Sequence, residues 1–283
     1  MSFAKPSPFI NVRIHNVDLL PSLSGFCVGY ERGAWRTQQL ADHVIEWLPE
    51  FALTPSECAT LGHDNAIKLI RSAARRVYES DKFRNRGEFG EVLLHAAVRQ
   101  VFDSVPAVSK IYYKSAANDT VKGFDAVHIV GAPDELELWI GEAKFYSDIT
   151  GAISNVVEEI RTHTETDYLR GEFLLIANKI DPKWPHADVL RRLLQPEVSL
   201  DLIFQRVCIP VLLTYDSPCV SSHTACDAGY ARAFEQEINA HYATFKAKEL
   251  PKEMKIHLFL MPLEKKAALV SALDEKLKLL QRL

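Results

Sequence analysis

The pattern of apolar and polar residues along the chain predicts a mixture of helices and strands. In some segments apolar residues recur every three or four positions, as they do on the buried face of an amphipathic helix. In shorter segments they alternate with polar residues or form a continuous run, which is typical of strands. We expect helices over residues 34–48, 64–80, 87–102, 148–167, 225–246 and 263–283. We expect strands over residues 9–17, 25–30, 109–115, 122–130, 136–142, 172–177, 207–214 and 254–261.

The order of these segments predicts the fold class. From residue 87 onward the order is helix, three strands, helix, two strands, helix, strand, helix, which favours an α/β core with a mixed central sheet flanked by helices. The turn that joins the strands at 122–130 and 136–142 predicts a hairpin. We treat residues 1–62 as an N-terminal α+β accessory region and residues 63–283 as the main domain, which includes the C-terminal helices.

Composition narrows the class of protein. The chain has 283 residues, of which 47% are apolar and 25% charged, as in ordinary globular proteins. Its formal net charge of −4 gives no general support for nucleic-acid binding, so such binding would need a local basic patch. Five scattered cysteines without a Cys-x-x-Cys pair indicate reduced thiols.

We find no signal peptide and no apolar stretch near the ~20 residues that span a bilayer, so we expect a cytoplasmic protein that does not interact with membranes.

An acid followed two positions later by a lysine occurs five times, and its context separates one occurrence from the rest. Only Glu142 and Lys144 end an apolar strand that is preceded by another strand with an acid, Asp125. Residues i and i+2 of a strand share a face, so Glu142 and Lys144 point the same way. If the two strands form a hairpin, Asp125 can lie beside Glu142 near the end of that hairpin.

Two carboxylates at that distance repel each other unless a cation lies between them. Their oxygen atoms suit Mg²⁺ or Mn²⁺. A lysine beside such a metal, here Lys144, could hold or activate water or stabilise charge on a phosphate. Glu88 and Glu91 lie three positions apart, on one face of the preceding helix, and either could supply a further carboxylate.

These residues resemble the PD-(D/E)XK nuclease superfamily. Its pattern is a helix with Glu, a strand with Asp, a strand that ends in Glu-x-Lys, and a helix. More closely, Gly-Glu-Phe-Gly-Glu at 87–91, Gly-Phe-Asp-Ala-Val-His at 123–128 and Gly-Glu-Ala-Lys-Phe-Tyr at 141–146 look like the HamA family, the small subunits of Hachiman anti-phage defence. The likeness is sharpest over residues 87–167. The usual Pro before the Asp is replaced by Phe124.

The resemblance implies a restriction-endonuclease-like core and metal-dependent cleavage of DNA phosphodiester bonds. By this resemblance Asp125, Glu142 and the carbonyl of Ala143 would bind the metal, Glu91 would be a further ligand or would position one, and Lys144 would orient or activate the water. Residues 63–283 would form the nuclease-like domain. The partner would be a HamB-like superfamily-two helicase that holds the nuclease inactive until DNA damage or invading DNA is sensed.

Other charged and aromatic residues have two interpretations each. Residues 68–86 hold two acids and seven basic residues: Lys68, Arg71, Arg75, Arg76, Lys82, Arg84 and Arg86. This basic segment could contact DNA phosphates, or it could be a solvated helix face or an interface with an acidic partner. Tyr146 could contact substrate or lead into the next helix. We expect His95, His128 and His163 to be hydrogen-bonded or core residues rather than catalytic bases.

The combined prediction is the metal-dependent DNA nuclease effector of a bacterial anti-phage defence complex. The main alternative is a non-catalytic subunit that tethers DNA or assembles the complex. In that alternative, tethering would depend on the basic segment and would survive the replacement of Lys144 by Ala. An RNA-cleaving toxin with the same core is a further alternative.

Overall fold

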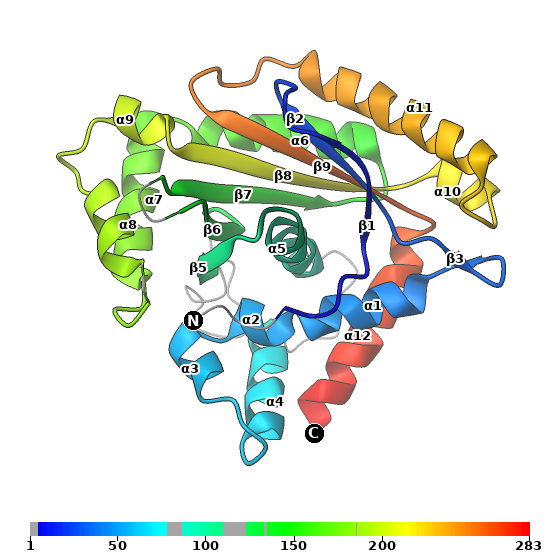
Figure 1. Cartoon of the computed structure of the whole chain (residues 1–283), viewed down its shortest axis with the longest axis horizontal. Helices are drawn as coiled ribbons and strands as arrows, with labels where there is room; N and C mark the ends of the chain where they lie inside the picture. Colours follow the sequence, from blue (N-terminus) through cyan, green and yellow to red (C-terminus); the bar gives the residue numbers. More distant parts are fainter. Residues whose placement is uncertain (1–4, 78–86, 110–122, 133–134, 185) are drawn as a thin grey trace.

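The computed structural model describes residues 5–77, 87–109, 123–132, 135–184 and 186–283 (Figure 1). Within these ranges the fold is built on a seven-stranded sheet with strand order β1-β2-β9-β8-β7-β6-β5. Its strands are β1 (Asn11–Asn16), β2 (Ser22–Cys27), β5 (Val105–Ser109), β6 (Ala126–Val130), β7 (Glu137–Phe145), β8 (Val207–Asp216) and β9 (Lys255–Leu263). A separate pair of two-residue strands comprises β3 (Tyr30–Glu31) and β4 (Ala34–Trp35).

The middle of the sheet is parallel and its two edges are antiparallel. Strands β2, β9, β8 and β7 run parallel as successive neighbours, while β1 is antiparallel to β2, β6 to β7, and β5 to β6. The predicted hairpin is confirmed, with Ala126 opposite Gly141 and Val130 opposite Glu137. Since helices flank this mixed sheet, the predicted α/β class with a mixed sheet is also confirmed.

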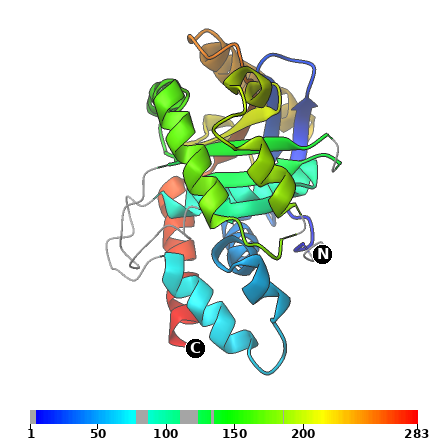
Figure 2. The ribbon, with the colours of Figure 1, turned by 90° about the vertical axis from the view of Figure 1, so that its left-hand side faces the viewer.

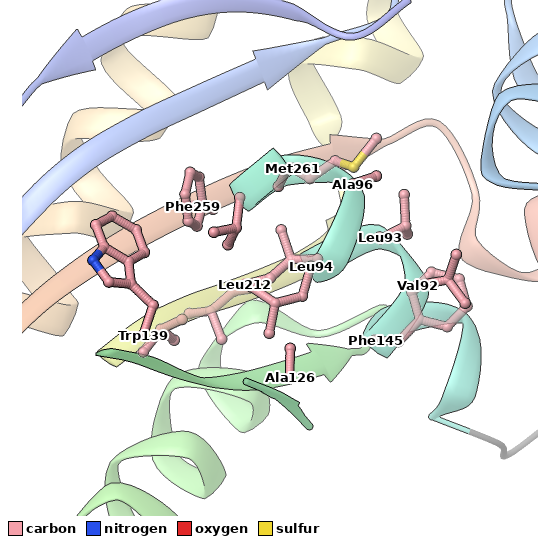
Figure 3. Close-up of a cluster of buried hydrophobic side chains, with 14 of the residues drawn as sticks. Val92, Leu93, Leu94, Ala96, Ala126, Trp139, Phe145, Leu212, Phe259 and Met261 are labelled. Atoms are coloured by element: carbon pink, nitrogen blue, oxygen red, sulfur yellow. The ribbon is translucent and has the colours of Figure 1, made fainter. Parts of the chain in front are cut away.

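Helix α5 (Glu88–Phe102) packs on one face of the sheet and carries much of the core. Figure 3 shows its Val92, Leu93, Leu94 and Ala96 against Ala126, Trp139, Phe145, Leu212, Phe259 and Met261 of the strands. Glycines allow this close approach. A Cβ on Gly141 would lie 2.7 Å from Leu94 Cδ2, and a Cβ on Gly90 would lie 2.8 Å from Phe145 Cβ. Each large apolar side chain buried here contributes about 1.5–3 kcal/mol.

A second layer of helices lies beyond α5, on the same side of the sheet (Figures 1 and 2). It contains α1 (Thr37–Glu46), α2 (Leu48–Ala52), α3 (Pro55–Ala59), α4 (Ala66–Val77) and α12 (Lys266–Arg282). The C-terminal helix α12 packs against both α1 and α4, so the last helix of the described chain shares a layer with its first helices.

The opposite face of the sheet is covered by α6 (Ile149–His163) and α11 (Ala228–Lys246) (Figure 1). Helix α6 contacts β7 and β8, and α11 contacts β2, where Gly25 lies beside Ile238. Shorter helices complete this half: α7 (Thr166–Lys179), α8 (Ala187–Leu193), α9 (Leu200–Phe204) and α10 (Pro218–Ser222).

One predicted strand is wrong. Residues 172–177 belong to helix α7. The helix buries Leu169, Phe173 and Ile176, which have helical spacing, and it leaves Leu174 and Leu175 half exposed. The five-residue apolar run from 173 to 177 carried no periodicity that could separate a strand from a helix turn.

Other predictions differ in detail. Most of the expected strand at 109–115 lies outside the described residues, and the strand that is described, β5, starts earlier. The helix expected over 148–167 is divided between α6 and the start of α7. Ile67, an apolar residue in the helix expected at 64–80, is exposed. The short helices α2, α3, α8, α9 and α10 were not predicted.

The N-terminal residues contribute to the same sheet as the rest of the chain. The hairpin of β1 and β2 joins the sheet through parallel pairing between β2 and β9, and Ser24 lies opposite Phe259. The division of the chain at residue 62 remains a prediction. Over the part of the chain that the structure describes, no helix is both long enough and apolar enough to cross a bilayer.

Candidate active site

A cleft of about 860 Å³ opens at the end of β7, where the chain leaves the sheet. Its walls come from five places: the start of α5, the residues that enter β6, the end of β7, helix α6 with the start of α7, and the first residue of α12. The polar and charged residues that line it include Glu91, Asp125, Glu142, Lys144, Tyr146, Ser147, Asp148, Glu159, Thr162, His163, Tyr168 and Lys266. The cleft therefore brings together residues that are distant in sequence.

Asp125 and Glu142 lie next to each other on paired strands, as the hairpin predicted. The backbone N–H of Asp125 donates to the carbonyl of Gly141 at 2.8 Å, which continues the β6–β7 register by one residue. The Asp125 Oδ2 atom accepts a hydrogen bond from the backbone N–H of Ala143 at 2.9 Å. Both carboxylates are buried. A pair of buried acids on neighbouring strands is unusual, because buried carboxylates need partners and two of them repel each other.

Lys144 shares the face of β7 with Glu142, and its ammonium group forms an ion pair with Glu159 of α6. The lysine side chain is 10% exposed, whereas that of Glu159 is 41% exposed. A buried ammonium group without a counter-charge is strongly unfavourable. Glu159 supplies that counter-charge inside the cleft.

His163, one turn beyond Glu159 on α6, contacts the other charged residue of the motif. Its Nδ1 atom lies 2.5 Å from Glu142 Oε1. The imidazole ring stacks on Tyr168, with 4.4 Å between centroids and 13° between planes, and meets the edge of Phe124 at 5.3 Å. We expected His163 to be a hydrogen-bonded or core residue. His163 is hydrogen-bonded, and its partner is Glu142, a residue of the cleft.

The other two histidines lie in the core. His95 is buried and its Nε2 atom lies 3.0 Å from Glu50 Oε2, which also accepts from Arg99. His128 is buried with its Nδ1 atom 2.9 Å from Ser104 Oγ, and burial lowers its pKa well below the usual value. For these two, the prediction of hydrogen-bonded core residues is confirmed.

Glu91 lines the cleft, but from a different side. Helix α5 packs on the face of β7 that presents Gly141, Ala143 and Phe145, while Glu142 lies on the face next to α6. The first turn of α5 thus reaches the cleft past the end of the sheet. Glu88 is not among the described residues that line it, so of the two acids Glu91 is the better placed.

The donor atoms of the cleft suit a hard divalent cation. Asp125 and Glu142 offer carboxylate oxygens and Ala143 a backbone carbonyl, all of which are oxygen ligands. Among the described residues, no three or more His, Cys, Asp or Glu side chains are grouped as a metal site. Mg²⁺ is commonly bound through one or two carboxylates and keeps several waters, so a pair of carboxylates fits it.

A second lysine, Lys266 at the start of α12, also lines the cleft. Its ammonium group lies 5.2 Å from the ring centroid of Phe145 and 5.9 Å from that of Tyr146. Burial lowers the pKa of Lys266, although the nearby charge of Asp216 partly opposes this. In the sequence, Lys266 ends another of the five acid-x-Lys patterns, Glu264-Lys265-Lys266, which falls within the helix expected over 263–283.

The predicted basic segment is only partly described. Lys68, Arg71, Arg75 and Arg76 lie on α4, while Lys82, Arg84 and Arg86 lie outside the described residues. Arg76 donates to both carboxylate oxygens of Glu57, at 2.5 and 2.7 Å, and to the carbonyl of Ala52. Arg76 therefore ties α4 to α2 and α3, and none of the four α4 residues is among those that line the cleft.

Comparison with known proteins gives the family. A model of the HamA family matches residues 7–277, which is nearly the whole chain. Anti-bacteriophage protein A of Escherichia coli strain K12 is 25% identical over 268 residues, covering 88% of this chain and 46% of that protein. The chain thus spans about half the length of this curated relative.

Proposed function

The chain belongs to the HamA family, and from this membership and the geometry of the cleft we propose that it is a metal-dependent DNA nuclease of anti-phage defence. The defence role is supported by the similarity to anti-bacteriophage protein A. The nuclease activity is supported chiefly by the meeting of Asp125, Glu142 and Lys144 in one cleft. The proposal includes a restriction-endonuclease-like core, for which the flanked mixed sheet is the expected setting.

In the proposed mechanism each cleft residue has a separate task. Asp125, Glu142 and the carbonyl of Ala143 would hold Mg²⁺ or Mn²⁺, which would stabilise charge on the phosphate and lower the pKa of a water. Lys144 has three donor protons, so it can keep its bond to Glu159 and donate another to a phosphate oxygen or a water. The ion pair fixes the location of the Lys144 ammonium group, and a positive charge at that place would stabilise the anionic transition state.

The proposed partner is a HamB-like superfamily-two helicase that restrains the nuclease. The basic segment is the proposed DNA-contacting surface, although Arg76 is already bound to Glu57. Lys68, the lysine of this segment on α4, is exposed.

The test is cleavage of plasmid and linear DNA by the purified chain, with and without the helicase partner. We expect cleavage with Mg²⁺, none with EDTA, and a loss of at least about 100-fold with Lys144→Ala, in line with the removal of one transition-state donor. The control is Lys265→Ala, whose side chain is exposed and contacts Asp216. If wild type and Lys144→Ala behave alike in every condition, the nuclease assignment is wrong and the tethering alternative replaces it. RNA substrates run in parallel distinguish the toxin alternative.

A further inference from the structure

Helix α6 brings two side chains against the two charged residues of the Glu142–Lys144 pair. Glu159 and His163 are four positions apart and so lie on one face of the helix. The start of α6 is fixed by Asp148, whose side chain accepts from the backbone N–H groups of Thr150 and Gly151. Three residues connect β7 to α6, and the contacts of Glu159 and His163 place the last turns of the helix over the end of that strand.

We propose that Glu159 and His163 are positioning residues of the active site. Glu159 sets the location of the Lys144 ammonium group, and His163 sets the orientation of the Glu142 carboxylate. This inference rests on the proposed function and deepens it, because it assigns tasks to two residues that the Glu-x-Lys motif does not contain.

The contact between Glu159 and Lys144 is more than a surface ion pair. Exposed pairs contribute little because water competes for both partners. Here the lysine is almost fully buried, and over the described part of the chain Glu159 is its ion-pair partner. A lysine side chain has four rotatable bonds, so without this partner its Nζ atom would have no defined place in the cleft.

Two aromatic side chains restrict the position of the His163 ring, which contacts Glu142. The stacked Tyr168 and the edge of Phe124 restrict its ring, and Phe124 directly precedes Asp125 in the chain. A ring fixed in this way holds Glu142 Oε1 at one position. Partners that orient metal ligands typically matter by about 10–100-fold in metal affinity or activity.

The experiment compares Glu159→Gln, His163→Ala and His163→Gln with the control Glu158→Gln. Glu158 is the exposed neighbour of Glu159 on the same helix and does not line the cleft. For each full-length variant we would measure kcat and KM for DNA cleavage, Mn²⁺ binding by calorimetry, and the midpoint of urea unfolding. We would also measure the rate at which Lys144 is acylated by a water-soluble reagent, using mass spectrometry.

We expect Glu159→Gln to lower kcat by about 10–100-fold with little change in KM, and to speed acylation of Lys144 several-fold. His163→Ala should weaken Mn²⁺ binding by about 10-fold, and His163→Gln, which keeps a donor, should restore part of it. If these variants match Glu158→Gln in kcat, Mn²⁺ affinity and acylation, and only their unfolding midpoints fall, the two residues are structural and the inference is overturned.

A failure of the proposed function gives a different result. In that case wild-type protein does not cleave DNA under any condition. The acylation rate of Lys144 and the Mn²⁺ affinity then still decide whether Glu159 and His163 position their partners.

Discussion

Near its end, strand β7 makes apolar contacts on one face and charged contacts on the other. On one face Gly141, Ala143 and Phe145 meet the apolar side of α5, and the contact is so close that two glycines are needed. On the other face Glu142 and Lys144 meet Glu159 and His163 of α6. Odd-numbered residues of this part of the strand thus pack against a helix, while the even-numbered residues carry the charged groups of the cleft.

The polar face cannot be explained by a contribution to the stability of the fold. Replacing buried ion pairs with well-packed apolar residues is often neutral or stabilising, whereas apolar packing such as that of α5 contributes directly. A fold that needed only to hold α6 in place would have no physical reason to bury Asp125, Glu142 and Lys144 together. Such groups are instead typical of functional sites.

The largest expected effect lies on the apolar face. Leu94→Ala removes a fully buried side chain between α5 and the sheet, so we expect the free energy of unfolding to fall by about 3 kcal/mol. Urea denaturation measures this change. The control is Leu279→Ala on α12, whose side chain is more than half exposed and should change stability by less than about 0.5 kcal/mol. Equal losses for the two variants would contradict the packing role of α5.

A smaller effect is expected at Lys266, which lines the cleft. Lys266→Ala removes a lysine that lines it, so we expect DNA affinity in EDTA to fall by about 3–10-fold and the salt slope of binding to fall by about one. Fluorescence anisotropy at several salt concentrations measures both. The adjacent Lys265→Ala is the matched control, because Lys265 pairs with Asp216 and does not line the cleft. If the two variants bind DNA alike, Lys266 does not contact the phosphates.

The smallest effect is expected for the partly exposed ion pair between Arg76 and Glu57. Hydrogen bonds from Arg76 lower the pKa of Glu57 to about 2, against the opposing effect of burial. A lowered folded-state pKa stabilises the protein above the unfolded value of about 4.5, and this contribution is lost as the pH falls towards 2. Because the pair is partly solvated, we expect only about 0.5 kcal/mol.

Urea unfolding between pH 5 and pH 2.5 measures this contribution. Wild type should lose about 0.5 kcal/mol more over that interval than Glu57→Gln, which cannot gain the proton. Glu249→Gln, at an almost fully exposed position, should keep the wild-type dependence. An identical pH dependence in Glu57→Gln and wild type would show that Arg76 does not hold Glu57 ionised.

Local periodicity was enough to predict the elements that build the core. Helix α5 begins one residue from its predicted start and ends at its predicted end, because its apolar face is regular. The hairpin of β6 and β7 followed from two apolar strands and a short turn. The strand expected at 172–177 failed because Leu174 and Leu175 of α7 are apolar yet exposed, and exposure depends on tertiary packing that the local pattern does not contain.

The same limit applies to the cleft. Asp125, Glu142 and Lys144 could be brought together from the sequence, because strand geometry and one hairpin relate them. Glu159 and His163 could not, since their contacts depend on how α6 crosses the sheet. The only sequence signal was an acid and a histidine at helical spacing, which many surface helices share. Lys266 required the placement of α12, the most distant element in the chain.

The position of β9 has a consequence for the synthesis of the protein. This strand lies between β8 and β2, so the first hairpin made, β1 and β2, has no place in the sheet until residues 255–263 have been added. The cleft is completed only three residues later, at Lys266. At roughly 5–20 residues per second, about 6–25 s separate the emergence of Lys144 from that of Lys266. Over that interval a growing chain carries Glu142 and Lys144 without the complete lining of the cleft.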